Sequence, residues 1–311
     1  MSAADVAVKT YRELEPEDLR ILQAIEKQTR KYQNIPQDII ARIAGLPPQE
    51  ALFRLPRLER KRLITRYTGA YIGYHLTVAG YDTLAVNHLV EANVLEAFGK
   101  PLGIGKEADV YDALMPDGTQ VAVKFHRLGR TSFKQTKRKR GYVTAYKYTP
   151  DWHQQSTIAA KREYKALKLL HPQGIAVPEP IAQNRHGLVM SRIEGAELYR
   201  YKEIPNPEAT LKEILANTRK AYQKAKMVHA DLSPYNIILQ PNQHILTIDW
   251  PQYVTHKHPN AEQLLRRDIQ NILRFFRNKY KMKTNLDQAL IYIKQPREAS
   301  HAKARIHTCR N

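Results

Sequence analysis

One eight-residue segment restricts the fold of this chain more than any other part of the sequence. Residues 229–236 read HADLSPYN, an H-x-D-x-x-x-x-N pattern, and the apolar run 237–239 follows at once. The carboxylate of Asp231 is able to accept or orient the proton of an attacking hydroxyl or water. Asn236 offers an amide oxygen to Mg²⁺, a cation that prefers oxygen ligands. We interpret His229 as a residue that braces this loop. The segment predicts a phosphoryl-transfer loop that leads into a strand.

A second strand-like segment ends in a carboxylate. Residues 245–251 read ILTIDWP, so Asp249 comes directly after an apolar run. In protein kinases a Mg²⁺-binding carboxylate occupies this place. Ordinary protein kinases continue Asp-Phe-Gly, whereas Trp250 and Pro251 follow here, and the rigid proline is expected to hinder a flip of the segment. Asp249 is therefore predicted to be both a catalytic residue and a metal ligand.

Earlier in the chain, residues 102–111 read LGIGKEADVY between two strand-like segments. Gly103 and Gly105 would let backbone N–H groups approach phosphates, and Val110 would pack on adenine. We count Lys106 among the nucleotide-binding residues as well. The motif is weak by itself, because Gly-x-Gly turns are common in plain hairpins and Ala108 replaces the usual third glycine.

The next strand carries VAVK at residues 121–124. Alternation along a strand places Ala122 and Lys124 on one face. The small alanine leaves room for a purine, and the Lys124 ammonium is expected to hold the α- and β-phosphates. A helix near residues 160–170 supplies Glu163 as the expected partner of Lys124, with Glu107 as the competing acid.

A hinge is expected after the apolar strand 187–190. Met190 would lie behind the adenine. The backbone of residues 191–193, ending at Ile193, would meet the polar edge of the base. This expectation follows from the order of the elements alone.

Residues 1–92 have the element order of a winged helix-turn-helix: three helices, a hairpin and a helix. Helices are expected after Pro16, Pro36 and Pro47, strands over 63–67 and 71–76, and a last helix from Thr77 to about Val94. The third helix is expected to turn its apolar side inward, namely Ala51, Leu52, Leu55 and Leu58. Its basic side would meet phosphates, as recognition helices do, or remain a solvated face; it comprises Arg54, Arg57, Arg60, Lys61 and Arg62.

The balance of charge favours a polyanionic partner. The chain has 50 Lys and Arg against 30 Asp and Glu, a net charge of +20, which attracts nucleic acid. No apolar stretch is long enough to cross a membrane. The single cysteine, Cys309, fits a reducing, cytoplasmic location. The polar, basic stretch 127–156 is expected to form a flexible loop, and 296–311 a disordered basic tail.

Together these motifs resemble the RIO family of atypical protein kinases, and most closely its second subfamily. The family's marks are G-x-G-K-E-[AS]-D-V-Y, H-x-D-[LF]-S-x-Y-N and I-D-x-[PW]-Q, which match residues 103–111, 229–236 and 248–252. The winged helix marks the second subfamily, and the resemblance covers about residues 5–295. The lack of a long C-terminal extension is similar to archaeal members.

The resemblance implies an α+β fold with a trimmed two-lobed kinase domain at 93–295, after the winged domain at 1–92. The N-lobe would cover about 93–190 and the C-lobe about 191–295. ATP and Mg²⁺ are implied cofactors, with Mn²⁺ as an alternative. The implied partners are the precursor of the small ribosomal subunit, its rRNA and ribosomal proteins. The implied chemistry includes an aspartyl phosphate on Asp249, with Ser132 or Ser156 as autophosphorylation sites.

Two other functions remain open at this point. A small-molecule phosphotransferase shares H-x-D-x-x-x-x-N but needs an acidic, helical substrate lobe, whereas the segment after Asp249 is basic. A nucleotide-sensing regulator that binds nucleic acid would also fit the winged helix and the charge. Ala230 replaces the arginine of H-R-D, and no Ala-Pro-Glu follows Asp249, so docking of a peptide in the usual kinase groove is not expected. ATP hydrolysis coupled to a conformational step fits better.

Overall fold

The computed structural model describes residues 2–128 and 151–295, which form two compact units. The first comprises residues up to 168 together with 178–193, and the second comprises 169–177 and the residues from 194 onward. The domain boundaries expected from the sequence, after residues 92 and 190, stay predictions.

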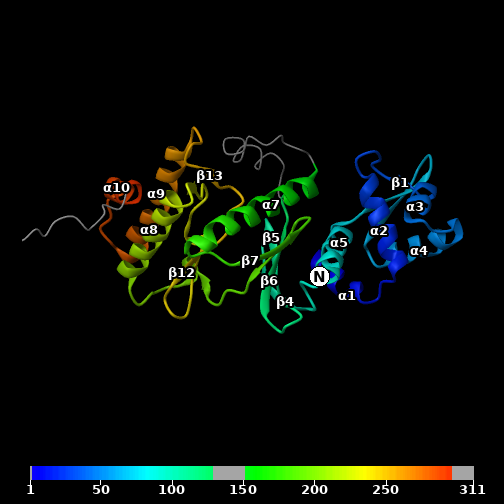
Figure 1. Cartoon of the computed structure of the whole chain (residues 1–311), viewed down its shortest axis with the longest axis horizontal. Coiled ribbons are helices and arrows are strands. Elements are labelled where there is room, and N and C mark those ends of the chain that lie inside the picture. Colours follow the sequence, from blue (N-terminus) through cyan, green and yellow to red (C-terminus); the bar gives the residue numbers. More distant parts are fainter. Residues whose placement is uncertain (1, 129–150, 296–311) are drawn as a thin grey trace, which may run out of the picture. The chain divides into compact units, whose positions relative to one another are not determined.

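The first unit begins with a winged helix-turn-helix (Figure 1). Its elements are α1 (Ala3–Tyr11), α2 (Pro16–Gln28), β1 (Ile35–Pro36), α3 (Gln37–Ala44), α4 (Pro48–Arg60), β2 (Ile64–Thr68), β3 (Ile72–Leu76) and α5 (Val78–Glu91). The strands form an antiparallel sheet in the order β1-β3-β2. Local signals start and stop these helices: the Thr77 hydroxyl accepts from the Gly80 N–H at the start of α5, and Gly45 ends α3 with a φ of 64°.

Two elements of this domain were not expected. Helix α1 begins at Ser2, which forms a capping box with Asp5, and the pattern of the first eleven residues did not indicate a helix. The short strand β1 adds a third strand to the expected hairpin. Helix α5 ends at Glu91 rather than near Val94.

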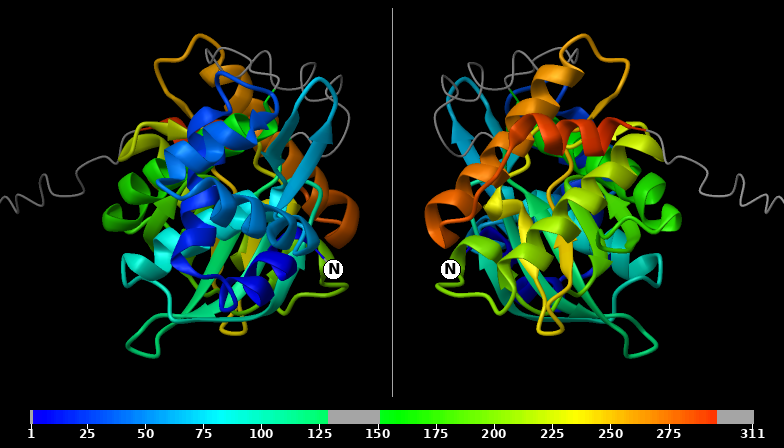
Figure 2. Two further views of the ribbon diagram at one scale, coloured as in Figure 1. Left: turned by 90° about the vertical axis from the view of Figure 1, so that its right-hand side faces the viewer. Right: turned by 90° about the vertical axis from the view of Figure 1, so that its left-hand side faces the viewer.

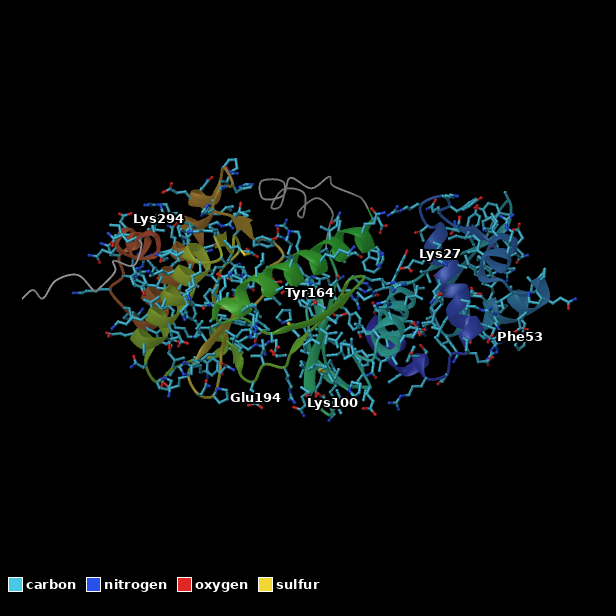
Figure 3. All side chains as sticks on the ribbon, viewed as in Figure 1. Lys27, Phe53, Lys100, Tyr164, Glu194 and Lys294 are labelled. Carbon is cyan, nitrogen blue, oxygen red and sulfur yellow. The ribbon has the colours of Figure 1, made fainter. Side chains whose placement is uncertain are left out.

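Helix α4 differs from expectation on both of its faces. Leu52, expected to point inward, is 49% exposed, and its neighbour Phe53 is 61% exposed (Figure 3 labels Phe53). Arg54, expected to meet phosphates, is buried. Its guanidinium lies 2.8 Å from Glu15, 3.1 Å from Asp18 and 2.6 Å from Glu50. Ala51, Leu55 and Leu58 are buried as expected. The expected pattern therefore fails only at Leu52, which is exposed, and at Arg54, whose acidic partners allow it to be buried.

The basic face of α4 is partly neutralised within the protein. Arg57 lies 3.5 Å from Glu15, and Lys61 forms an ion pair with Glu13. Arg60 and Arg62 are exposed. The prediction that Arg54 contacts nucleic acid is wrong, and only part of the expected basic face remains exposed.

The first unit continues with a five-stranded antiparallel sheet in the order β4-β5-β6-β8-β7, with one long helix. Its elements are β4 (Ala97–Ile104), β5 (Ala108–Leu114), β6 (Gln120–His126), α7 (Trp152–Leu170, within this unit through Lys168), β7 (Pro180–Asn184) and β8 (Gly187–Ser191). The stretch 127–156 was expected to be a loop throughout. Instead Arg127 and Leu128 are buried and α7 begins at Trp152; residues 129–150 lie outside the described residues.

Helix α5 joins the two parts of this unit. Ala79, Tyr81 and Leu84 pack in the core of the winged domain, whereas Ala85, Val86 and Leu89 pack against the five-stranded sheet. Residues 79–87 of α5 are all buried, so the helix is covered on nearly every side along this stretch. The side chains of the sheet that meet α5 come from one face, namely Tyr111, Ala113, Val121, Val123, Phe125 and Val189.

The second unit is mainly helical (Figure 2). Its helices are η1 (His171–Gln173), η2 (Leu198–Arg200), α8 (Pro207–Gln223), η3 (Pro234–Asn236), α9 (Ala261–Tyr280) and α10 (Leu286–Lys294). Helices α8, α9 and α10 contact one another. The short strands are β9 (Ala196–Glu197), β10 (Met227–Val228), β11 (Ile237–Leu239), β12 (Ile245–Thr247) and β13 (Val254–Thr255). Strand β11 pairs with both β12 and β9, which places the segments 229–236 and 248–250 at the ends of neighbouring strands.

Within the described ranges, 2–128 and 151–295, no helix has both the length and the apolar composition needed to cross a bilayer.

Candidate active site

Four of the predicted nucleotide-binding side chains share one face of the five-stranded sheet. Val110 lies opposite Lys124 in the register of β5 and β6, and Ala122 lies opposite Met190 in the register of β6 and β8. Paired residues of an antiparallel sheet lie on the same face, and so do residues two apart on a strand. The four side chains therefore line the face opposite the one that packs on α5. Alternation predicted the shared face of Ala122 and Lys124, and the register of the sheet adds Val110 and Met190 to it.

The ion pair predicted for Lys124 is present. Lys124 Nζ donates to both carboxylate oxygens of Glu163 on α7, at 2.9 and 2.8 Å, and both side chains are buried. His126 Nε2 lies 2.9 Å from Glu163 Oε2. Burial opposes the charge of Glu163, but the Lys124 ammonium and His126 outweigh it and lower the pKa of this carboxyl to about 2. Glu163 is thus ionised at neutral pH, and it fixes the position of the Lys124 ammonium.

The glycine-containing segment forms the turn between β4 and β5. Gly103, Gly105 and Lys106 are all exposed. The Gly105 N–H donates to the Ala108 carbonyl at 2.8 Å, and a Cβ at Gly105 would lie 3.2 Å from that oxygen, so the turn is tightest there. The Glu107 carbonyl accepts from the Arg127 N–H at 2.7 Å. This hydrogen bond fixes the end of the exposed turn to the strand that carries Lys124.

The expected hinge lies at the end of the first unit. The Ser191 N–H donates to the Glu179 carbonyl at 2.9 Å, and Ile193 is half-buried. The contact of this backbone with adenine stays a prediction.

In the second unit, the loop that carries Asp231 is held by a buried acid. Asp268, on α9, accepts from the Ala230 N–H at 2.7 Å and from the Leu232 N–H at 3.1 Å. Arg267 donates to the Ala230 carbonyl. Burial raises the pKa of Asp268 to about 7, although Arg267 and the two N–H bonds oppose the rise. The Asp268 carboxyl thus fixes the backbone on both sides of Asp231, whose own side chain is exposed.

His229 has the bracing role expected for it. Its Nδ1 accepts from the Asp231 N–H at 3.3 Å, which leaves Nε2 as the donor toward the Ile248 carbonyl at 2.9 Å. The ring also packs on Trp250, with ring centroids 4.5 Å apart. The ring of His229, with both nitrogens engaged, ties the Asp231 loop to the segment that leads into Asp249.

The oxygen chemistry of this region fits a magnesium ion. Asn236 donates its Nδ2 to the Asp231 carbonyl at 2.8 Å, so its Oδ1 remains an acceptor suited to a hard cation. The Asn236 carbonyl accepts from the Ile248 N–H at 3.0 Å, which ties Asn236 to the strand before Asp249. Within residues 2–128 and 151–295 no group of three or more His, Cys, Asp or Glu could hold a metal ion, and a Mg²⁺ shared with phosphate oxygens needs only one or two protein ligands.

Strained backbone occurs at one predicted catalytic acid of this unit and directly before the other. Asp249 has a φ of 66°, and Ala230, directly before Asp231, has a φ of 65°. A non-glycine residue in this region costs about 1–3 kcal/mol, and such residues cluster at functional sites. The hydrogen bonds of Ala230 to Asp268 and Arg267 hold it in this conformation.

Sequence reasoning did not find three residues that shape the site. His126 is two residues after Lys124 on the same strand, so alternation could have placed it on the same face. Asp268 interrupts the apolar side of α9, between Leu265 and Ile269, and a lone acid in such a position is a usable signal. Arg127 left no signal, because it stands at the start of a stretch that reads as a basic loop.

One predicted modification site is not exposed. Ser156 is fully buried, and its hydroxyl accepts from the Leu128 N–H at 2.9 Å. Ser156 is therefore not available as a phosphate acceptor in this structure. Ser132 lies outside the described residues.

Comparisons with known proteins identify relatives over nearly the whole chain. The family model of the RIO domain matches residues 109–289, and that of the Rio2 N-terminal domain matches residues 11–92. The RIO-type serine/threonine-protein kinase Rio2 of Methanocaldococcus jannaschii is 40% identical over 277 residues, covering 85% of this chain and 99% of its own length. The serine/threonine-protein kinase rio2 of Schizosaccharomyces pombe is 35% identical over 280 residues, which cover 89% of this chain and 80% of its own length.

A solved structure agrees with these relatives. The Rio2 kinase of Chaetomium thermophilum, crystallised as an ADP/Mg²⁺-phosphoaspartate complex, is similar with a TM-score of 0.77 and 30% identity, covering 91% of this chain and 87% of its own. The fold expected from the sequence, a winged domain followed by a RIO kinase-like domain, is confirmed. The chain belongs to the Rio2 branch of the RIO family of serine/threonine-protein kinases.

Proposed function

We propose that this protein is a Mg-ATP-dependent atypical serine kinase and ATPase that acts in maturation of the small ribosomal subunit. The observation that carries the chemistry is the buried Lys124–Glu163 pair, with nitrogen-to-oxygen distances of 2.9 and 2.8 Å. A buried ion pair on a strand whose same face is lined by small and apolar side chains is suited to a nucleotide with its phosphates at the ammonium.

The remaining residues take roles that their surroundings allow. Lys124 would bind the α- and β-phosphates, and the turn with Gly103, Gly105 and Lys106 would cover them. Val110, Ala122 and Met190 would contact adenine, with the backbone at Ile193 along its polar edge. Asn236 and Asp249 would hold Mg²⁺, which neutralises charge on the phosphate oxygens when bound; Mn²⁺ suits the same oxygen ligands.

We propose Asp249 as the first phosphate acceptor. One of its carboxylate oxygens attacks the γ-phosphorus of ATP, the bond from that phosphorus to the bridging oxygen breaks, and ADP leaves. Water then attacks the aspartyl phosphate while Asp231 takes its proton, which releases inorganic phosphate and restores Asp249. The phosphoaspartate in the Chaetomium thermophilum relative supports this order of events. A serine hydroxyl in place of water would make the same site a protein kinase.

The proposed partner is the precursor small subunit, with its rRNA and ribosomal proteins. The net charge of +20 supports a partner rich in phosphate. We propose a cytoplasmic location for this work. The alternative of a DNA-binding regulator has less support, because Arg54 of the expected recognition helix is buried among carboxylates.

The catalytic assignment is tested with Asp231→Ala. This variant is expected to bind Mg-ATP with nearly unchanged affinity, because Asp231 contributes no contact to the adenine or the first two phosphates. Turnover should fall by a factor of about 10² or more, since general-base catalysis contributes about that much. Phosphate release and nucleotide binding are measured on the same protein. Undiminished phosphate release would refute the role of Asp231.

The ribosomal assignment needs its own experiment. Wild type and Asp249→Ala are sedimented with small-subunit precursor particles, with and without ATP. We expect ATP to release the wild type and to leave Asp249→Ala bound. Absence of both proteins from the particles would exclude this partner while leaving the ATP chemistry intact.

A further inference from the structure

A hollow next to the catalytic loop has no role in the chemistry described above. It lies within the second unit, has a volume of about 530 Å³, and is bounded by η3 on one side and by the C-terminal half of α9 on the other. Sites for small ligands commonly measure about 300–1,000 Å³. The hollow is thus large enough for a nucleotide-sized group.

The α9 wall is a continuous stripe along one side of the helix. Its members follow the pattern i, i+3, i+4, i+7, i+8 of one helical face: Asn271, Arg274, Phe275, Asn278 and Lys279. The stripe therefore combines an aromatic ring, two amides and two cations in one line. None of the residues that line the hollow is acidic.

Aromatic rings continue the surface on the other wall. Tyr235 is 61% exposed and packs against Tyr199, with ring centroids 4.3 Å apart. Tyr199 itself is 38% exposed. Tyr199 does not itself line the hollow, but it contacts residues that do: besides its ring contact with Tyr235, its carbonyl accepts from Lys279 Nζ at 3.0 Å. Lys279 Nζ also lies 5.2 Å from the centre of the Phe275 ring. The Tyr199 and Tyr235 rings thus form one aromatic surface beside the lining of the hollow.

We propose that this hollow binds a short single-stranded segment of RNA. Single strands are bound by aromatic rings on which bases stack, together with cations that follow the phosphates. Tyr235 and Tyr199 provide the stacking surface, Arg274 and Lys279 the positive charge, and Asn271 and Asn278 donors and acceptors for base edges. The choice of RNA rests on the proposed ribosomal function, whereas the single-stranded character rests on the exposed rings.

The test is a titration of a fluorescent single-stranded RNA dodecamer, and of the same sequence as a duplex, into the full chain without nucleotide. Three variants are compared: Arg274→Glu, Tyr199→Ala and the matched control Arg277→Glu. Arg277 is an exposed cation on the same helix, but it does not line the hollow. Thermal unfolding of each variant shows that it is folded.

We expect Tyr199→Ala to weaken binding of the single strand roughly tenfold, the loss typical of one stacked base. Arg274→Glu should weaken it by a similar factor, because it replaces attraction of a phosphate with repulsion. Tyr199→Ala should leave the duplex affinity unchanged, because paired bases cannot stack on the ring. Arg277→Glu should change single-strand affinity by less than about threefold. Ultraviolet crosslinks of the bound RNA should map to Tyr199 or Tyr235.

Equal losses for Arg274→Glu and Arg277→Glu would overturn the proposal, because they would indicate diffuse attraction by charge. An unchanged affinity for Tyr199→Ala would overturn it as well. If the variants keep RNA affinity but lose binding of an acidic, tyrosine-containing decapeptide, the occupant is a peptide and the proposal fails. Since no nucleotide is present, these failures are distinguishable from failure of the proposed ATP chemistry.

Discussion

At the residue scale, burial decides what each charge of this chain does. Lys124, Arg54 and Arg127 are all nearly inaccessible, and each is matched by carboxylates at hydrogen-bonding distance. Removing one partner of such a pair leaves a charge without solvation, which costs far more than the pair contributes. Arg54 and Arg127 therefore hold the fold together, and Lys124 is held in position for its proposed phosphate ligands. The net charge that a partner meets is carried by exposed residues such as Arg60 and Arg274.

Arg54→Ala is expected to destabilise the protein by about 3–5 kcal/mol, because Asp18 stays buried without its partner. Arg60→Ala, an exposed neighbour on the same helix, should change stability by less than about 0.5 kcal/mol. Urea unfolding measures both. If Arg54→Ala were as harmless as Arg60→Ala, the buried carboxylate cluster would have no structural role.

Asp268→Asn should weaken the hold on the Asp231 loop. An asparagine keeps one acceptor oxygen, so either the Ala230 or the Leu232 N–H loses its bond, at a cost of about 1–3 kcal/mol. ATP turnover should fall while ATP affinity is retained. Measured kcat and nucleotide Kd, compared with wild type, check this.

The same residue predicts a dependence of stability on pH. The pKa of Asp268 is raised by burial from 3.8 to about 7, so the folded protein holds a proton that the unfolded chain releases over this range. Its contribution to stability is therefore largest below pH about 4 and decreases as the pH rises to about 7. Asp268→Asn should lose this component, and identical pH profiles of unfolding for both proteins would contradict it.

At the element scale, helix α5 links the winged domain to the proposed nucleotide site. Its Asp82 accepts from Arg127 at 2.8 and 2.6 Å, and Arg127 also donates to Asp109 at 3.0 Å, within the glycine-containing motif. The His186 ring nitrogen Nε2 lies 2.7 Å from Asp82. All four side chains are buried. A residue of the winged domain thus supports the base of the nucleotide-binding turn.

Asp82→Ala is expected to cost about 3–5 kcal/mol in unfolding free energy, because it removes the bidentate partner of the buried Arg127. The double variant Asp82→Leu, Arg127→Met removes both charges and should recover part of that loss. Denaturant unfolding of the three proteins provides the comparison. A double variant less stable than Asp82→Ala would show that the charges themselves are needed.

At the scale of the whole molecule, the sequence predicted the elements with strong local signals. Prolines, Gly45 and Thr77 indicated the helices of the winged domain, strand alternation placed Ala122 and Lys124 on one face, and the order of the elements indicated Met190. What it could not predict depends on distant partners: Arg54 is buried only because carboxylates from α2 meet it, and Arg127 only because Asp82 does. Such pairs leave no periodicity in the sequence, and a basic residue reads as exposed until its partner is known.

Binding of Mg-ATP should stabilise the whole protein by mass action. At a ligand concentration of about 100 Kd the gain is about 2.7 kcal/mol, visible as a higher Tm. Lys124→Met should lose most of this shift, and EDTA should reduce it in the wild type. An equal shift in Lys124→Met would mean that nucleotide binds elsewhere.

Because α5 packs in two cores, it also limits which rearrangements of the gene leave a folded protein. One side of the helix completes the winged core, and the other completes the sheet that carries Lys124. Recombination that deleted or exchanged the winged domain would remove α5 and expose the apolar face of the sheet that carries Lys124. The winged domain and the sheet that carries Lys124 are therefore expected to be inherited together. A truncated protein without the winged domain should be insoluble.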